Sequence, residues 1–216
     1  MPQSMGMKAL LKNILRKQQR KVRALTHLNG DELTHLNQMI INRLLRYYQY
    51  LKGKRTSENQ FVISGYYPIQ TEFNIMPSLK ALKKYSSIKL ALPEVTGKGD
   101  PLIFWEWDPS MDMTKKKDKF KIPIPSCSMA LVPDIILCPM LGFNDYGGRL
   151  GYGGGYYDRT ILEIIEHQHK TPIKIGIAYE NQKCTMRGIA HDWDVLLDEI
   201  ITEKFLYRIS AISQIA

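Results

Sequence analysis

The sequence predicts an α/β protein with a mainly parallel sheet and flanking helices, in a Rossmann-like three-layer architecture that follows an N-terminal helical pair. Two observations predict this class. From residue 60 onward, short apolar runs rich in β-branched and aromatic residues alternate with segments of helical periodicity, which is typical of parallel sheets covered by helices. Before residue 52, the apolar residues recur at helical spacing. The chain of 216 residues is expected to form one domain, 1–216, with basic helices at 7–51 and an α/β body at 60–203.

The N-terminal pair is expected to consist of helices at residues 7–25 and about 31–51. In the first, apolar residues form a stripe beside a basic face: Met7, Leu10, Leu11, Ile14, Leu15, Val22 and Leu25. We expect that basic face to be solvated and to attract polyanionic ligands. In the second helix, Asn29 or Asp31 can cap the N-terminus. Its core-facing side consists of Leu33, Leu36, Ile40, Leu44, Tyr47 and Leu51.

The body is predicted from apolar runs that polar loops separate. Strands are expected at residues 61–66, 88–92, 102–105, 134–138, 173–178 and 199–202. Helices are expected at residues 75–84 and 159–169. The lysine-rich segment 115–121 is expected to be a solvated loop. Cys127, Cys138 and Cys184 have no zinc-site spacing, so reduced, buried thiols without a disulfide are expected.

Six of the fifteen glycines lie within residues 147–155, between a predicted strand and a predicted helix. Glycines alone predict a tight turn as readily as a ligand site. The neighbouring residues favour a site, because Arg149 supplies a cation, Tyr156 and Tyr157 supply flat ring surfaces, and Asp158 supplies a carboxylate. A strand, a glycine-rich loop and a helix in this order place backbone amides and a helix N-terminus around phosphate. The segment therefore predicts a phosphate-binding loop.

The net charge of +9 comes from the N-terminal quarter of the chain. Residues 1–55 contain twelve Lys or Arg against two Asp or Glu, and the rest contains eighteen against nineteen. A basic helical pair could bind nucleic acid, but aromatic residues are not interleaved with the cations of the first helix and no nucleic-acid motif is present. We therefore expect polyanionic small molecules as partners, and no nucleic acid. Without a membrane-length apolar run or a signal-peptide core, a cytoplasmic protein with no membrane partner is expected.

Two segments, PDIILCPMLGFN at 133–144 and GRLGYGGGYYDR at 148–159, resemble the signature of the 5-formyltetrahydrofolate cyclo-ligases. Weaker agreement extends the resemblance over residues 8–202 and includes Lys12 with Arg16, Tyr67 with Glu72, and the segment 175–179. The resemblance implies an enzyme that cyclises 5-formyltetrahydrofolate, with or without a polyglutamyl tail, to 5,10-methenyltetrahydrofolate. We expect the protein to be a monomer. ATP and Mg²⁺ would be required, the formyl oxygen would be phosphorylated, and ADP and phosphate would be released.

The resemblance also implies roles for individual residues. The ATP-binding set is Lys12, Arg16, Arg149, Leu150, Gly151, Tyr152, Gly153, Gly154, Gly155, Tyr156 and Tyr157. The folate-binding set is Tyr67, Glu72, Tyr152, Gly153, Gly154, Gly155 and Tyr156. The magnesium-linked acids are Asp158 and Asp194, and the catalytic residues are Arg149, Tyr156 and Asp158.

The chain departs from the family pattern at several of these positions. Some relatives carry Arg and Lys where this chain has Tyr152 and Gly154, so phosphate charge must be met by Arg149 and the N-terminal helix. Either Asp192 or Asp194 can be the second acid, and Asp194 is preferred because it keeps the family's four-residue step to the next Asp. Two other hypotheses stay open: another phosphate-ligand enzyme, such as a sugar-phosphate isomerase or CoA transferase, and a basic nucleic-acid-binding or scaffold protein.

Overall fold

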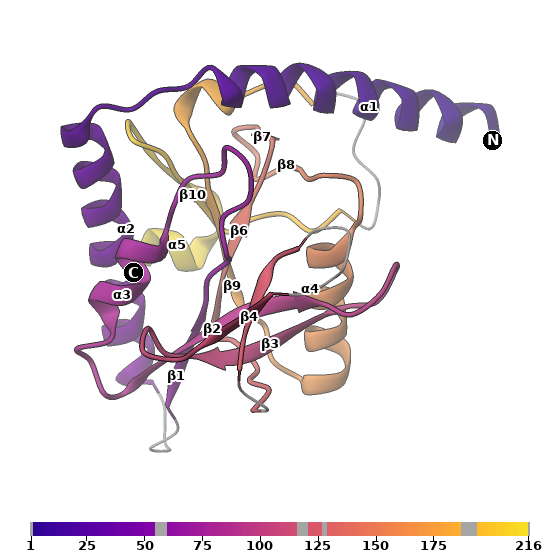
Figure 1. The fold of residues 1–216 in the computed structure, drawn as a ribbon. Coiled ribbons are helices and arrows are strands. Elements are labelled where there is room, and N and C mark those ends of the chain that lie inside the picture. Colours follow the sequence, from indigo (N-terminus) through magenta and orange to yellow (C-terminus); the bar gives the residue numbers. More distant parts are fainter. Residues whose placement is uncertain (1, 55–59, 116–120, 127–128, 187–193, 216) are drawn as a thin grey trace.

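The computed structural model describes residues 2–54, 60–115, 121–126, 129–186 and 194–215 (Figure 1). The helices are α1 (Pro2–Ala24), α2 (Gly30–Lys52), α3 (Met76–Leu82), α4 (Tyr156–Gln168), the 3₁₀ turn η1 (Glu180–Gln182) and α5 (Ala211–Ile215). The strands up to residue 125 are β1 (Phe61–Ser64), β2 (Ile88–Val95), β3 (Leu102–Trp107), β4 (Met113–Lys115) and β5 (Pro123–Pro125). The later strands are β6 (Ile135–Pro139), β7 (Gly142–Phe143), β8 (Arg149–Leu150), β9 (Ile173–Ile177), β10 (Glu199–Ile201) and β11 (Leu206–Arg208).

Seven strands form one sheet in the order β11-β10-β9-β6-β1-β2-β3. The five strands from β10 to β2 are parallel to one another, and the edge strands β3 and β11 pair antiparallel with their neighbours. This arrangement confirms the predicted mainly parallel sheet. The chain leaves β1 toward β2 on one side and later returns to β6 on the other. Because ligands of open α/β sheets bind where the strand order reverses, the carboxyl ends of β1 and β6 are the expected site.

Alternate residues of the central strands pack against different helices. Ile63 of β1 and Ile135 of β6 lie in the same apolar cluster as α2 and α3, whereas Val62 and Ile136 lie in the cluster that contains Ile161 of α4. Successive side chains of a strand point to opposite faces, so α2 and α3 cover one face of the sheet and α4 covers the other. Figure 1 shows the resulting three layers, with α1 running across their upper end. The predicted three-layer architecture is confirmed.

Helix α2 forms as its sequence predicts. The Asn29 side chain accepts a hydrogen bond from the Glu32 amide, and the Glu32 carboxylate accepts one from the Asn29 amide, which makes a capping box. The residues that pack against the sheet recur at helical spacing and are fully buried: Leu36, Ile40, Leu44 and Tyr47. Leu33 is an exception to the predicted core-facing side, because 39% of it remains exposed near the helix N-terminus.

Helix α1 packs against the body through a mostly polar face, and not through the apolar stripe as its sequence suggests. The buried or half-buried positions are mostly polar and recur at helical spacing: Lys8, Lys12, Leu15, Arg16, Gln19, Val22 and Arg23. Most of the apolar stripe points to solvent, with Met7 59% exposed, Leu10 56% and Ile14 55%, and only Leu15 and Val22 of that stripe are half-buried. The expectation of a solvated basic face is therefore wrong for most of this helix. Cations of this helix bind carbonyl and carboxylate groups of the body, and these contacts account for the orientation of the helix.

Other differences from the predicted elements are short segments. The predicted glycine loop is shortened by a hairpin in which Gly142 pairs with Leu150 and Phe143 with Arg149. Two-residue strands carry too little periodicity to be recognised from sequence.

In the lysine-rich segment, Lys115 ends β4, and residues 116–120 lie outside the described residues, as does Cys127. Cys138 and Cys184 are free thiols, as predicted. Within the described part of the chain, none of the helices combines the length and apolar character needed to cross a bilayer.

A buried ion pair joins α2 to the sheet and gives a stability prediction. Arg43 Nε donates to both carboxylate oxygens of Glu199 at 2.8 and 2.9 Å, and Glu199 is fully buried. The variant Arg43→Met should lose about 3–5 kcal/mol in the free energy of unfolding, because it leaves a buried carboxylate without its cation. Urea denaturation measures this loss. The double variant Arg43→Met with Glu199→Met should recover most of it, and a loss below about 1 kcal/mol in the single variant would contradict the argument.

Candidate active site

The candidate site lies where the strand order of the sheet reverses. The loop after β1 runs from Gly65 to Ile75 and carries Glu72, and the chain after β6 forms the β7–β8 hairpin and the glycine loop 151–155. Helix α1 crosses above both loops, since Arg16 contacts the glycine loop and Arg23 contacts the loop after β1. Three segments that are distant in the sequence therefore meet at the carboxyl ends of β1 and β6, as expected for ligand sites in open α/β sheets.

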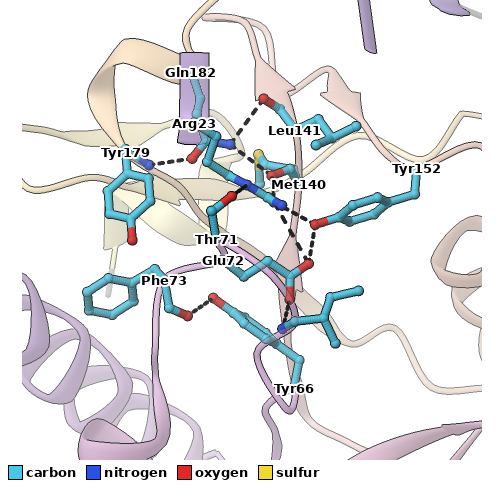
Figure 2. Close-up of polar contacts among 11 residues, drawn as sticks. Arg23, Tyr66, Thr71, Glu72, Phe73, Met140, Leu141, Tyr152, Tyr179 and Gln182 are labelled. Carbon is cyan, nitrogen blue, oxygen red and sulfur yellow. Dashed lines mark hydrogen bonds and ion pairs between the residues drawn. The ribbon is translucent and has the colours of Figure 1, made fainter. Parts of the chain in front are cut away.

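Glu72 is the centre of a buried polar network, which Figure 2 shows. One carboxylate oxygen accepts a hydrogen bond from the Tyr152 hydroxyl at 2.5 Å, and the other accepts one from the Ile69 amide at 2.9 Å. The Arg23 guanidinium donates to the same Tyr152 hydroxyl at 2.5 Å and lies 3.9 Å from the Glu72 carboxylate. Glu72 and Arg23 have side chains only 4% and 2% exposed. The network holds the carboxylate in one orientation.

Burial and neighbouring charge have opposite effects on the Glu72 carboxyl. Burial raises its pKa, whereas the hydrogen bonds from Tyr152 and Ile69 and the charge of Arg23 lower it, and the net direction is upward. Burial also raises the pKa of Tyr152 and of the neighbouring Tyr66, and the charge of Glu72 adds to both shifts. The tyrosines therefore remain neutral hydrogen-bond donors, and the protonation of Glu72 is sensitive to the charge of Arg23.

The glycine loop uses backbone conformations that side chains resist. Gly153 has a φ of +102° and Gly155 a φ of +64°. A Cβ atom on Gly153 would lie 3.3 Å from Cζ of Arg16, so the loop and the helix approach each other closely. Gly155 is the N-cap of α4 and provides no capping side chain. The N-cap therefore places no side chain over the start of α4, and this end of the helix carries partial positive charge that favours an anion.

The cations of α1 line the glycine loop. Arg16 Nε donates to the Gly151 carbonyl at 2.9 Å, and Lys12 Nζ forms an ion pair with Asp194 at 2.7 Å. The Arg20 guanidinium lies 6.0 Å from the centre of the Tyr152 ring. Burial and the charge of Arg20 lower the pKa of Arg16, and Asp194 opposes them. Such crowding of positive charge is relieved by a bound polyanion.

Arg149 and Asp158 form an ion pair beneath this loop. Arg149 Nη2 donates to Asp158 Oδ1 at 2.6 Å, and its guanidinium lies 5.4 Å from the centre of the Tyr157 ring. The Arg149 side chain is 5% exposed, and its buried Nη1 has no hydrogen-bond partner among the described residues. Burial raises the pKa of the adjacent Cys138 thiol to about 11, so this cysteine is unreactive near neutral pH.

The two predicted magnesium-linked acids come close together at this corner. Asp158 Oδ1 also accepts the amide of Val195, the residue after Asp194, at 3.2 Å. Within the described residues, no group of three His, Cys, Asp or Glu side chains forms a metal site. Mg²⁺ that arrives with a nucleotide needs one or two carboxylates, because phosphate and water supply the other oxygens. Asp158 fits this role, since its Oδ2 atom makes no hydrogen bond in the described part of the chain and its side chain is 21% exposed.

Comparison with known proteins identifies the family. The model of the 5-formyltetrahydrofolate cyclo-ligase family matches residues 6–203. The chain belongs to this family. The 5-formyltetrahydrofolate cyclo-ligase of Mycoplasma pneumoniae is 31% identical over 193 residues, which cover 89% of this chain and 99% of that protein. This relationship confirms the family that the two signature segments predicted.

Solved structures of similar proteins agree with the family. The NMR structure of Aquifex aeolicus 5,10-methenyltetrahydrofolate synthetase is 27% identical, with a TM-score of 0.66, and covers 92% of this chain and 93% of its own. A 5,10-methenyltetrahydrofolate synthetase from Mycoplasma pneumoniae is 29% identical, with a TM-score of 0.60, and covers 89% of this chain and 98% of its own. The chain is thus an enzyme of the cyclo-ligase family, and the prediction of a ligase is confirmed.

Most residues predicted for a cyclo-ligase site lie in one region of the structure. Helix α1, the glycine loop, Glu72 and the Arg149–Asp158 pair are connected by the contacts described above. Tyr156 is the first residue of α4, and the Arg159 guanidinium lies 5.4 Å from the centre of its ring. Tyr67 is half-buried in the loop that carries Glu72. Asp192, the alternative acid, lies outside the described residues.

Sequence reasoning missed Arg23 and Arg20. Both lie on the first helix, where they were counted as part of a basic face and not as site residues. Arg23 contacts Tyr152, which is 129 positions later in the chain, so no local pattern could reveal the pair. The available signal was the helical spacing of Arg16, Arg20 and Arg23, which places all three near one side of the helix.

The glycine loop yields a prediction about backbone strain. Gly153→Ala should lower the free energy of unfolding by about 1–2 kcal/mol, because φ is positive there and the new Cβ meets Arg16. Gly151→Ala is the matched control, since Gly151 has no positive φ and no atom within 4 Å of an added Cβ. Chemical denaturation of both variants tests the difference. Equal stability of the two would show that the loop relaxes away from this conformation.

Proposed function

We propose that this cyclo-ligase family member converts 5-formyltetrahydrofolate to 5,10-methenyltetrahydrofolate, using ATP and Mg²⁺ and releasing ADP and phosphate. The observation that carries the proposal is the adjacency of two binding surfaces that differ in chemistry. A cationic surface of α1, the glycine loop and the α4 N-terminus suits a polyphosphate. A buried carboxylate, Glu72, suits the N–H donors of a pterin. Tyr152 belongs to both surfaces, because it lies in the glycine loop and donates to Glu72.

In the proposed reaction, the formyl oxygen attacks the γ-phosphorus of ATP, and the folate N10 then attacks the activated formyl carbon as phosphate leaves. Phosphoryl transfer needs positioning and charge stabilisation more than covalent help from the protein. Lys12, Arg16 and the amides of the glycine loop, residues 151–155, are the groups proposed to hold the phosphates. Arg149 positions Asp158 through their ion pair, and its unpartnered Nη1 is a donor for developing negative charge.

When bound, Mg²⁺ would supply positive charge that offsets the negative charge of the phosphates. Asp158 is proposed to hold it, with Asp194 as the second acid. For the folate, Glu72 is proposed to accept hydrogen bonds from the pterin, and Tyr67 and Tyr156 to flank a ring. The cation surplus at the site supports a polyanionic pair of ligands: Lys12, Arg16, Arg20, Arg23, Arg149 and Arg159 stand against Glu72, Asp158 and Asp194.

Further parts of the proposal are a monomeric state, a cytoplasmic location, and acceptance of folates with or without a polyglutamyl tail. Family membership removes the support for a sugar-phosphate isomerase or CoA transferase. The nucleic-acid alternative is weakened because Lys12, Arg16 and Arg23 face the body at the glycine loop and the Glu72 network, and not the outer surface of the helix. A DNA complex that persists at about 0.2 M salt would revive it.

A direct assay tests the proposed activity. The purified protein is incubated with 5-formyltetrahydrofolate and MgATP, and the near-ultraviolet absorbance of the methenyl product is followed. We expect product to form at a rate that depends on enzyme and on ATP, with ADP and phosphate released in equal amounts. Omission of ATP and omission of Mg²⁺ are the controls. Product formation without ATP, or none with it, would refute the proposal.

The role of α1 predicts a selective effect on ATP. The double variant Lys12→Ala with Arg16→Ala should raise the KM for ATP by about tenfold or more, because each cation that contacts phosphate contributes about 1 kcal/mol or more. Lys21→Ala is the matched control on the same helix, since this lysine is exposed. Steady-state kinetics at saturating folate measure the change. An equal rise of the KM for ATP in the double variant and in Lys21→Ala would indicate that the overall positive charge of the helix matters, and not contact of Lys12 and Arg16 with phosphate.

The carboxylates predict a dependence on magnesium. Asp158→Asn should raise the Mg²⁺ concentration needed for half-maximal activity by about tenfold, because the amide keeps the shape and loses the charge. Asp194→Asn should shift the curve in the same direction, and Asp192→Asn should leave it nearly unchanged. A Mg²⁺ titration of the three variants at saturating ATP decides between the acids. A shift with Asp192→Asn and none with Asp194→Asn would place the second ligand two residues earlier.

A further inference from the structure

We infer that Arg23 is a positioning residue for the folate site: it orients Glu72 and keeps it ionised, directly by its charge and indirectly through the Tyr152 hydroxyl. This inference rests on the proposed function, in which Glu72 accepts hydrogen bonds from the pterin. It assigns a role in folate binding to the N-terminal helix, whose other cations Lys12 and Arg16 are proposed to hold phosphate. One helix would thus act on both ligands.

The contacts of Arg23 converge on the Glu72 loop. Its Nε donates to Thr71 Oγ1 at 3.0 Å, and its Nη1 donates to the Tyr152 hydroxyl at 2.5 Å and to the Met140 carbonyl at 3.2 Å. Thr71 is the neighbour of Glu72 in sequence, and Tyr152 is the donor to Glu72. The Met140 carbonyl is held from another side by the Gln182 amide at 2.8 Å. Figure 2 shows the guanidinium enclosed by these partners, so its position is fixed.

The hydroxyl of Tyr152 acts as a link between the two charges. It accepts a hydrogen bond from Arg23 and donates one to Glu72, so each bond polarises the other. The other carboxylate oxygen is held by the Ile69 amide. Tyr66, Tyr157 and Tyr179 also lie around this pocket, and they are phenols with raised pKa values that add no positive charge. The Arg20 guanidinium lies farther from the centre of the Tyr152 ring, at 6.0 Å, than the Arg23 guanidinium does, at 5.4 Å. The cation that counters the burial of Glu72 is Arg23.

The consequence is a pH dependence with a defined sign. Glu72 must be ionised to accept two hydrogen bonds from a pterin, and burial works against the ionised form. Without Arg23, the Glu72 pKa rises further, a larger fraction is protonated at neutral pH, and folate binding weakens. Raising the pH should restore binding, because it restores the carboxylate. A purely structural role for Arg23 predicts no such recovery.

The test compares Arg23→Met with Glu72→Gln and with the double variant. We expect Arg23→Met to raise the KM for 5-formyltetrahydrofolate by about tenfold near neutral pH, and to lose much of that effect by about pH 9. Glu72→Gln should raise the same KM without this pH dependence, and the double variant should be no worse than Glu72→Gln. The KM for ATP should rise clearly less than the KM for 5-formyltetrahydrofolate in all three variants. Lys21→Met is the control for removal of a cation from α1.

Two results would overturn the inference. If the two substitutions raise the KM for 5-formyltetrahydrofolate by factors that multiply in the double variant, Arg23 acts independently of Glu72. If the KM for ATP rises as much as the KM for folate, Arg23 merely docks the helix. Should Arg23→Met fail to fold, Tyr152→Phe removes the link while it leaves the guanidinium in place, and a smaller pH-dependent rise in folate KM is expected. An unchanged folate KM and pH profile in a folded Tyr152→Phe variant would count against the link.

A ligand-free measurement separates this inference from the proposed function. Carbon-13 NMR of glutamate-labelled protein reports the titration of Glu72, assigned by its absence in Glu72→Gln. The Glu72 pKa should be higher in Arg23→Met, or in the neutral and more polar Arg23→Gln if Arg23→Met does not fold, than in the wild type. If the wild type forms no methenyl product while this shift is observed, the proposed function fails and the coupling stands. An unchanged Glu72 pKa would refute the coupling, whatever the enzyme catalyses.

Discussion

The arrangement of the site depends on how helix α1 is held, which is by charge rather than by apolar packing. Lys12 pairs with Asp194, Arg16 bonds the Gly151 carbonyl, and Arg23 is enclosed by the Glu72 network. Charged hydrogen bonds of this kind are among the stronger ones in proteins when they are shielded from water. Because the same side chains anchor the helix and contact the glycine loop and the Glu72 network, the N-terminal helix is part of the proposed site.

The helix also sets the distance between the two surfaces. Lys12 and Arg23 are eleven residues apart, which corresponds to about 16 Å along a straight helix. Arg16 near one end contacts the glycine loop, and Arg23 near the other end lies beside Glu72, the carboxylate proposed to bind the folate. A rigid element that touches both surfaces makes them interdependent. A shift of α1 caused by phosphate would be transmitted to Tyr152 and Glu72, because Tyr152 belongs to the loop that Arg16 holds.

The sequence was sufficient to predict the sheet, its helical layers and the family, because those features rest on local periodicity and on one continuous signature. The structure brings most of the proposed site residues together, and their roles stay predictions. The sequence was not sufficient for α1. The spacing of Met7, Leu10 and Ile14 correctly predicts a helix, but periodicity does not say which face meets the body. The β7–β8 hairpin could not be predicted because its strands are only two residues long. The role of Arg23 could not be predicted because its partner Tyr152 lies 129 residues later in the chain.

The exposure of most of the apolar stripe of α1, where burial of that stripe was expected, has a physical explanation. Burying a leucine or isoleucine side chain stabilises a fold by about 1.5–3 kcal/mol, so a helix that leaves Leu10 and Ile14 more than half exposed forgoes several kcal/mol. Turning the helix over would bury them and would remove Arg16 and Arg23 from the glycine loop and from Glu72. Glu72 would then be a buried carboxylate without its cation, which costs several kcal/mol as well. Sequence rules fail most often at functional sites, and here the rule fails on the element that carries the cations that the reaction would require.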